Sequence, residues 1–393
     1  MRKYKLVVIG CILIILGCKS TTKNNTITST NKKNVLFIMV DDLRPELNIY
    51  GQSQIISPNI DALANSGVTF NRAYCNVPVC GASRASLLTG IRPTSNRFLT
   101  YFSSIKKEAP NVLNLVQHLK NEGYMTISNN KITHLKNDID EWDQEWYASE
   151  NGWRKYISEE NITLEENGKH GNAYENIDVK DDAYDDGKTA SKSIEDLKKL
   201  KKEGNPFFLA VGFVKPHLPF NAPTKYWDMY DRNEIKQPYN NYVPKNAPKR
   251  SISKWREMRD YTGIPKQGGV TDETAISLIH GYYATVSYVD ALIGQIMAVL
   301  IDLELDKNTI VILVSDHGYN LQEHTQWSKY TSYRTSTRVP LMIHLPAMAK
   351  GSKTNALVDL IDVYPTVVEL LDIELPKHQL AGESLVPVLK DPS

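Results

Sequence analysis

The sequence has almost no net charge. Its 46 lysines and arginines stand against 45 aspartates and glutamates, which leaves a formal net charge of +1. A protein that binds a polyanion along its length needs a strongly basic face, so this balance gives no indication of nucleic-acid binding. An anionic ligand would have to be held locally, by a few well-placed cations.

Cysteine is also scarce, with four in 393 residues. Cys11 falls inside an apolar N-terminal run and Cys18 lies two residues beyond its end, so only Cys75 and Cys80 remain for the folded part. A single bridge between them would not make the disulfide framework that is typical of small exported proteins. We interpret Cys75 as a structural thiol, whereas the neighbours of Cys80 indicate chemistry.

The N-terminal apolar run, Leu6–Leu16, is too short to span a bilayer and follows the basic segment Met1–Lys5. It ends in Ile15-Leu16-Gly17-Cys18, which resembles the lipobox of bacterial lipoproteins. The resemblance implies a signal peptide over residues 1–17 and export with a lipid anchor at Cys18, to the periplasm or the cell surface. A plain secretory peptide is the alternative. Residues 18–33 are polar without apolar periodicity and are interpreted as a flexible tether.

From residue 34 onward, apolar runs alternate with helical periodicity. Runs rich in β-branched residues predict strands that are buried on both faces. The alternation predicts an α/β fold with a mostly parallel central sheet between helices. Residues 137–185 are interpreted as a surface insertion, and 221–269 as a long loop excursion that shapes a cleft. Strands are expected at 34–40, 126–128, 207–213, 310–315 and 341–344, and helices at 57–66, 83–89, 111–121, 189–202, 271–303 and 359–371, the last interrupted near Pro365.

Reactive side chains follow these predicted strands. Asp41 and Asp42 come directly after the first strand. Two adjacent carboxylates repel each other unless a cation lies between them, so we favour a metal site over a solvated turn. Ligands of parallel sheets bind outside the carboxyl ends of the strands, and the shared placement therefore indicates one site. The other side chains placed in this way are Lys131, His134, His217, Asp316 and His317.

The stretch Val79–Pro93, V-C-G-A-S-R-A-S-L-L-T-G-I-R-P, is unusual as packing. Its small residues from Gly81 to Ser83 would allow a tight turn that leaves Cys80 uncovered. A helix over residues 83–89 would then present free N–H groups that favour an anion. The alternative is a loop that enters a buried helix and carries an inert apolar cysteine.

Taken together, these residues resemble the sulfatase family of the alkaline-phosphatase superfamily. The run Cys80–Arg84, with Leu88-Thr89-Gly90, is similar to the signature that directs oxidation of its cysteine to formylglycine (3-oxoalanine). Within the family, Lys215–Phe220 and the pair Asp316-His317 most resemble the iduronate-2-sulfatase branch.

Two positions depart from the family pattern. Ala82 stands where the family usually has proline, which implies maturation by the anaerobic, radical-type enzyme. Members of the branch also continue into a small C-terminal subdomain beyond a segment like Gly382–Pro387. The resemblance therefore implies a catalytic domain over residues 34–393 that is truncated at its C-terminal end.

The resemblance also implies a metal site. Asp41, Asp42, Asp316 and His317 would hold a divalent cation together with the oxygens of the modified Cys80. Carboxylates are hard oxygen donors that suit Ca²⁺. The imidazole of His317 is a softer ligand, which leaves Mg²⁺ and Mn²⁺ as alternatives.

The remaining site residues would act on the ester and on residue 80. Arg84 and Lys131 would fix the hydrated aldehyde, whose one hydroxyl attacks sulfur and whose second then releases sulfate. Lys329 and His217 would bind sulfate oxygens. His217 would be the acid to the leaving oxygen and His134 the base, although the two histidine roles could be exchanged.

The implied activity is hydrolysis of a sulfate ester on a sugar. Export and the long loop excursion favour a sulfated oligo- or polysaccharide, either glycosaminoglycan fragments with 2-O-sulfated uronate or ulvan. Arg92 and Arg97 could pair with the uronate carboxylate or could be surface arginines. Two alternatives are a phosphodiesterase or phosphonate hydrolase of the same superfamily, and a non-catalytic glycan-binding lipoprotein.

Overall fold

The computed structural model describes residues 32–150, 153–253, 257–346, 351–377 and 380–392. The predicted signal peptide, the lipid site at Cys18 and nearly all of the predicted tether fall on residues 1–31, outside the described residues, and stay predictions. The fold described below is that of the unit from Lys33 onward.

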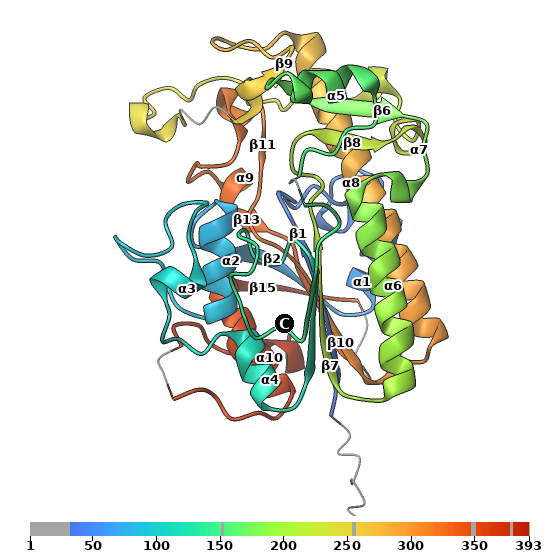
Figure 1. The fold of residues 1–393 in the computed structure, drawn as a ribbon. Coiled ribbons are helices and arrows are strands. Elements are labelled where there is room, and N and C mark those ends of the chain that lie inside the picture. Colours follow the sequence, from blue (N-terminus) through green and yellow to red (C-terminus); the bar gives the residue numbers. More distant parts are fainter. Residues whose placement is uncertain (1–31, 151–152, 254–256, 347–350, 378–379, 393) are drawn as a thin grey trace, which may run out of the picture. The chain divides into compact units, whose positions relative to one another are not determined.

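Within the described residues, a sheet of nine strands is built around β1 (Asn34–Val40). β1 pairs in parallel with β10 (Thr309–Ser315) on one side and β7 (Phe207–Phe213) on the other (Figure 1). β3 (Met125–Asn130) continues the parallel set beside β7, and β4 (Gln144–Trp146) pairs in parallel with β3. Every residue of β1, β7 and β10 is buried, as the uninterrupted apolar runs predict.

The other half of the sheet is mixed. β14 (Leu341–His344) runs antiparallel to both β10 and β2 (Val68–Tyr74). β2 also pairs with β13 (Arg338–Val339), antiparallel, and with β15 (Ser352–Asp359), parallel. The predicted mostly parallel α/β sheet is confirmed, whereas β2, β13 and β15 were not predicted.

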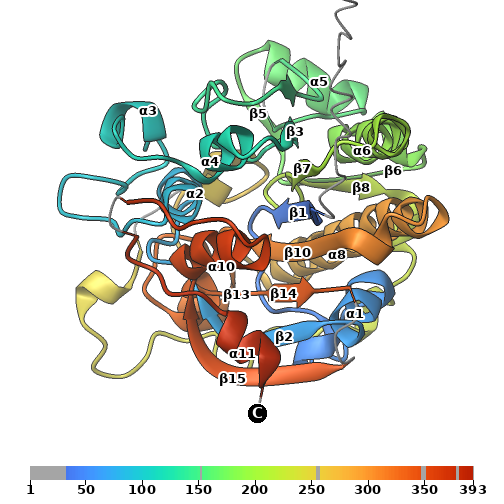
Figure 2. The same cartoon turned by 90° about the horizontal axis from the view of Figure 1, so that it is seen from below.

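Helices cover both faces of the sheet, because the central strand β1 carries apolar side chains on both of its faces. Val35, Phe37 and Met39 pack into one core and the alternate residues of the strand into another. The first core contains α2 (Cys80–Thr89), α4 (Leu115–Asn121) and α10 (Val363–Leu370), and the second contains α1 (Pro58–Asn65), α6 (Asp185–Glu203) and α8 (Asp272–Asp302) (Figure 2). Each fully buried aliphatic side chain stabilises the fold by roughly 1.5–3 kcal/mol relative to exposure.

Several helix boundaries differ from those predicted. α4 begins at Leu115 because the Asn114 side chain caps it, accepting the N–H of Gln117 at 2.9 Å. α6 begins at Asp185, four residues before the predicted start. Pro365 does not interrupt α10, because it lies in the first turn, where its missing N–H is not needed. A 3₁₀ turn, Leu360–Asp362, leads into this helix.

Helix α8 agrees with prediction and begins where the Thr271 side chain accepts the N–H of Thr274. Of the helices in the described ranges, it is the one long and apolar enough to cross a membrane by length and composition. Its apolar residues are largely buried against α1, α6 and β8 (Phe220–Pro223), as in the core helix of a globular domain.

The two irregular segments predicted between strands carry elements of their own. β5 (His170–Asn172) pairs with β9 (Tyr261–Thr262), and β6 (Tyr174–Ile177) pairs with β8, so the two segments are joined. Figure 1 shows β6, β8 and β9 with α5 (Glu159–Glu166) and α7 (Thr224–Trp227) in the upper part, beyond the carboxyl end of β1. The remaining short elements are α3 (Ile105–Glu108), β11 (Asn320–Leu321), β12 (Trp327–Ser328), α9 (Arg334–Thr337) and α11 (Val386–Lys390).

Candidate active site

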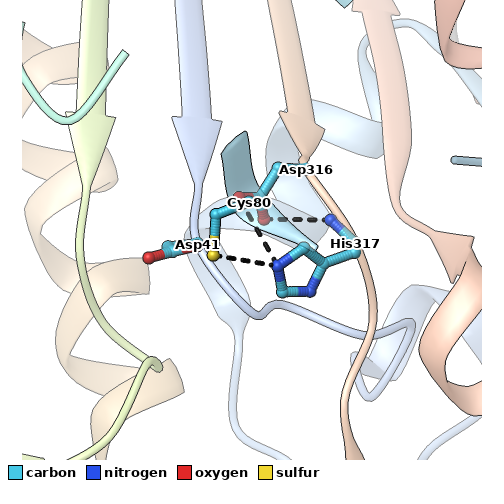
Figure 3. Close-up of side chains that lie close together, drawn as sticks. All are labelled: Asp41, Cys80, Asp316 and His317. Atoms are coloured by element: carbon cyan, nitrogen blue, oxygen red, sulfur yellow. Dashed lines mark hydrogen bonds and ion pairs between the residues drawn. The ribbon is translucent and has the colours of Figure 1, made fainter. Parts of the chain in front are cut away.

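The strand-end residues predicted to meet do so. Asp41 and Asp42 follow β1, and Asp316 and His317 follow the neighbouring parallel strand β10. The same edge receives Lys131 after β3 and the segment containing His217 after β7, because these strands are parallel. Figure 3 shows Cys80, the first residue of α2, against Asp41, Asp316 and His317.

The predicted exposure of Cys80 is wrong. Helix α2 begins at Cys80 rather than Ser83, all ten of its residues are buried, and Cys80 itself is 2% exposed. The small residues serve close packing: a Cβ atom on Gly81 would lie 2.3 Å from the carbonyl oxygen of Tyr101. Cys80 therefore forms the floor of a cavity. Cys75 is a separate buried free thiol, so the predicted structural role is confirmed and the two cysteines are not bridged.

The first cluster of the site consists of Asp41, Cys80, Asp316 and His317, whose ligand atoms all lie within 4.8 Å of one another. The Nε2 atom of His317 is 3.2 Å from Cys80 Sγ, and its Nδ1 atom is 2.9 Å from the carbonyl oxygen of Gly318. The carbonyl can only accept, so the ring proton belongs on Nδ1. Nε2 thereby presents its lone pair to residue 80, as in a metal-ligating histidine.

Arg84 ties the carboxylates of this cluster together. Its Nε donates to Asp316 Oδ2 at 2.7 Å, and its Nη2 lies 3.4 Å from Asp41 Oδ1. Nη1 donates to the carbonyls of Lys131 and Ile132, and the Lys131 ammonium forms an ion pair with Asp41 Oδ2. In this structure both predicted residue-80 partners are thus engaged with the carboxylates that surround residue 80.

The charges in the cluster set its protonation. Burial would raise the pKa of Asp41, but the charges of Lys131 and Arg84 hold it well below its usual range. Burial, followed by the charge of Asp41, raises the pKa of the Cys80 thiol well above its usual value. The thiol is therefore neutral and is not itself an activated thiolate nucleophile.

The donor set fits a divalent cation. Asp41 Oδ1 is buried and accepts no hydrogen bond from the described residues. Burial and the nearby charge of Asp41 both raise the pKa of Asp316, although Arg84 partly offsets this. Two buried carboxylates that repel each other and a histidine nitrogen with a free lone pair are satisfied together by a cation.

Asp42, predicted as a ligand of the same cation, occupies a strained position beside this cluster. Its φ is +59°, a left-handed conformation that costs a non-glycine residue roughly 1–3 kcal/mol. Its backbone N–H donates to Asp316 Oδ1 at 3.3 Å and its carbonyl accepts from Tyr282. Both carboxylate oxygens accept from Lys329 Nζ, at 3.0 and 2.9 Å, and Oδ1 lies 3.3 Å from His317 Nδ1. Asp42 therefore links the first cluster to Lys329.

Sequence reasoning missed Glu257, which completes a second group with His217 and Lys329. Its Oε1 atom is 3.0 Å from His217 Nε2 and 3.0 Å from Lys329 Nζ. Burial would raise the pKa of Glu257, but the charges of Lys329 and His217 hold it well below its usual range. The residue lies on a 3₁₀ turn, Glu257–Asp260, inside a Pro-, Asn- and Tyr-rich stretch that offers no motif.

A cavity of about 650 Å³ opens above Cys80. It is lined partly by residues of the 221–269 segment, which confirms that this excursion shapes a cleft. His134 faces the cavity, and burial, followed by the charge of Lys131, lowers its pKa to about 3. Further lining residues that sequence reasoning did not single out are Tyr101, Phe102, Trp153, His170, Asp260, Tyr261 and Tyr330.

Arg92 and Arg97 do not line this cavity. The Nη1 atom of Arg92 is 2.8 Å from Asp359 Oδ2, and Arg97 donates to the backbone carbonyl of Arg92. Arg92 is well exposed, so the interpretation of the pair as surface arginines is the one the structure favours.

The sulfatase family model matches residues 33–373, and the chain belongs to this family. Iduronate 2-sulfatase of Mus musculus is 31% identical over 404 residues, which span 92% of this chain and 72% of that protein. A sulfatase of Formosa agariphila is 29% identical and is covered over 74% of its length, with 92% of this chain.

Solved structures confirm the fold. A phosphonate monoester hydrolase from Silicibacter pomeroyi has a TM-score of 0.74 at 22% identity, covering 92% of this chain and 77% of its own. A structure described as a complex with its substrate, D-glucosamine-2-N,6-O-disulfate, has a TM-score of 0.73 at 22% identity, with 92% and 81% coverage. The predicted sulfatase-like α/β architecture is therefore shown.

Proposed function

We propose that this protein hydrolyses a sulfate ester on a sugar, using a formylglycine derived from Cys80 and a divalent cation. The observation that carries the proposal is the convergence of Cys80 with Asp41, Asp316 and His317 at the carboxyl edge of the sheet, in a chain of the sulfatase family. The neutral thiol of Cys80 supports it too, because an unmodified cysteine in this environment is a poor nucleophile.

Two groups supplied to this chain would provide the chemistry. A divalent cation, with Ca²⁺ as first choice and Mg²⁺ or Mn²⁺ as alternatives, would draw charge from the ester oxygens. The hydrated aldehyde at residue 80 would provide the attacking oxygen. Asp41, Asp42, Asp316 and His317 would hold the cation. Asp41 Oδ1 is buried and accepts no hydrogen bond from the described residues, although Arg84 Nη2 lies 3.4 Å away, so it is available as a ligand atom.

The chain's own cations would hold the ester. Arg84 and Lys131 hold Asp41 and Asp316 in place, since they form ion pairs with them, and their charges lower the pKa of Asp41 and so favour its ionised form. Lys329 and His217 lie at the cavity above Cys80, where sulfate oxygens would bind. Lys329 remains charged, because Asp42 and Glu257 offset the effect of burial and raise the pKa of its ammonium.

The geometry supports the assignment of His217 as the acid and His134 as the base. Both ring nitrogens of His217 face acceptors, Leu218 O at 2.6 Å and Glu257 Oε1 at 3.0 Å, so only the doubly protonated ring donates to both. His134 is neutral because its pKa is lowered to about 3, so its ring has an unprotonated nitrogen, but a base with such a low pKa accepts a proton only weakly near neutral pH.

The proposed substrate is a uronate-containing, 2-O-sulfated oligosaccharide of glycosaminoglycan or ulvan type. Its support is the 31% identity to an iduronate 2-sulfatase. A screen of defined disaccharides that carry one sulfate each, at uronate O2 or at glucosamine N or O6, tests it. Preferential release of sulfate from uronate O2 is expected, and preference for a glucosamine sulfate would replace this substrate class.

The reaction class needs its own test, because a phosphonate hydrolase shares the fold. Rates on an aryl sulfate, an aryl phosphate and an aryl phosphonate should be compared with the mature enzyme. Sulfate should be preferred, and a clear preference for either phosphorus ester would overturn the proposal. Mass spectrometry of the peptide that contains Cys80 should show a loss of about 18 Da from the thiol form. An unmodified thiol in the native host would favour the glycan-binding alternative.

We also propose the cellular setting that the N-terminal sequence implies. The support is the Leu16-Gly17-Cys18 pattern for lipid anchoring and export, and Ala82 for maturation by the anaerobic enzyme. Radiolabelled fatty acid should be incorporated into wild-type protein and not into Cys18→Ala. Co-expression with anaerobic rather than oxygen-dependent maturase should produce the aldehyde.

A further inference from the structure

Glu257 occupies the position that the proposed function gives to the ester. A single oxygen, Glu257 Oε1, lies 3.0 Å from both His217 Nε2 and Lys329 Nζ. These are the two donors expected to bind sulfate oxygens. A carboxylate oxygen and a sulfate oxygen accept the same kind of charge-assisted hydrogen bond, so the two groups compete for one place.

Among the described residues, acceptors already occupy all the N–H protons of the His217 ring and of the Lys329 ammonium. His217 Nδ1 donates to the carbonyl of Leu218 at 2.6 Å, so Nε2 is its remaining donor, and that atom faces Glu257. Lys329 Nζ has three protons, and its contacts are the two oxygens of Asp42 and the one of Glu257. A sulfate oxygen can therefore bind both donors only where Glu257 Oε1 now lies.

The side chain of Glu257 can move away from the two donors into the cavity that it lines. The residue lines the 650 Å³ cavity and its side chain is 15% exposed, in contrast to the Lys329 side chain at 3%. It lies on the short 3₁₀ turn Glu257–Asp260, outside the central sheet. Rotation of one side chain into the cavity would free both donors without moving the strand ends.

We propose that Glu257 is an internal anion that holds His217 and Lys329 in the free enzyme and that the sulfate group displaces. The inference rests on the proposed function. Glu257 would then be a determinant of sulfate affinity. Sulfate binds only molecules in which Glu257 has left His217 and Lys329, so the observed affinity falls as the fraction of such molecules falls. Its return to the two donors would also favour release of the sulfate product.

The test measures binding of inorganic sulfate to the mature, Ca²⁺-loaded protein by calorimetry. Glu257→Gln removes the charge, and Glu257→Ala removes the competing acceptor altogether. Both variants should bind sulfate more tightly than wild type, by about tenfold for the alanine variant, with a parallel fall in KM and no rise in kcat. Asp302→Asn removes a charge from an exposed position at the end of α8, outside the lining of the cavity, and it should change sulfate affinity by less than about twofold.

Equal or weaker sulfate binding by both Glu257 variants would overturn the proposal and leave Glu257 as a support for His217. Thermal unfolding shows whether each variant folds. If one of the two Glu257 variants does not fold, the sulfate affinity of the other variant tests the proposal. A sulfate-bound crystal structure in which Glu257 Oε1 still contacts both donors would overturn it as well. Sulfate binding needs no turnover, so a wild type that binds sulfate but does not cleave the ester would refute the proposed function and leave this inference standing.

Discussion

The Nε2 atom of His317 lies 3.2 Å from the Sγ atom of Cys80. The two residues come from different elements. His317 follows β10, which pairs with the central strand β1, and Cys80 is the first residue of α2. The hydrogen bond from His317 Nδ1 to Gly318 fixes the ring orientation. Residue 80 and the ligand cluster are therefore held as one unit, and the predictions below probe it and its surroundings.

Asp316→Asn should weaken Ca²⁺ binding by at least about tenfold, because it removes a ligand charge and the partner of Arg84. Direct calcium titration of the purified protein measures this without relying on turnover. Asp302→Asn, at an exposed position near the end of α8, is the control. Calcium affinity equal to that of wild type would remove Asp316 from the ligand set.

Cys80→Ala should abolish turnover of an aryl sulfate while lowering the free energy of unfolding by only about 1 kcal/mol. Cys80 is buried but lines a cavity, so loss of its sulfur removes few packing contacts. Urea unfolding measures the stability, and Cys75→Ala, at the other buried thiol, should keep its activity. A stability loss of several kcal/mol at position 80 would identify it as a packing residue.

His134 should make the fold sensitive to acid. Its pKa is lowered from 6.5 to about 3 in the folded protein, so the unfolded chain binds a proton that the folded chain refuses. The stability from this group is complete above pH 6.5 and is lost as the pH falls toward 3. Between pH 7 and 5 the unfolding free energy of wild type should fall by about 2 kcal/mol more than that of His134→Gln. Parallel slopes for the two proteins would contradict the lowered pKa.

Asp290 on α8 should stabilise the start of α1. Its carboxylate accepts from the backbone N–H of Ile60 at 2.7 Å and from both nitrogens of Asn59. Burial raises the pKa of Asp290 to about 6, which offsets part of this gain. Asp290→Ala should therefore cost about 2 kcal/mol in urea unfolding, with kcat/KM unchanged. Asp302→Ala on the same helix should cost almost nothing, and equal effects of the two would deny the capping role.

Much of the site was predictable because its residues follow strands that are easy to recognise. The runs at 34–40, 207–213 and 310–315 are apolar throughout, and parallel strands place their carboxyl ends at one edge. Asp41, Lys131, His217 and Asp316 could thus be placed together before any coordinates were known.

The rest depended on contacts that are distant in the chain. β15 is partly exposed and pairs in the described part of the chain with β2 alone. Both strands mix buried and exposed residues, and neither shows a clear apolar pattern. Glu257 meets His217 and Lys329 because its turn folds back over them, and nothing around it in the sequence is periodic. The small residues of α2 were interpreted as exposing Cys80, whereas Gly81 is required by close packing against the backbone of Tyr101.

The complete burial of α2 also constrains the order of events in the life of the protein. All ten residues of Cys80–Thr89 are buried in the folded chain, which leaves the backbone of this stretch no room to bind as an extended peptide. Ser83 and Arg84 are bound to Asp316, a residue more than two hundred positions further along. An enzyme that reads this stretch as its substrate can reach it only in a chain that has not yet folded. The conversion proposed for Cys80 would therefore take place during biosynthesis, and a molecule that folds first with its thiol intact would keep that thiol.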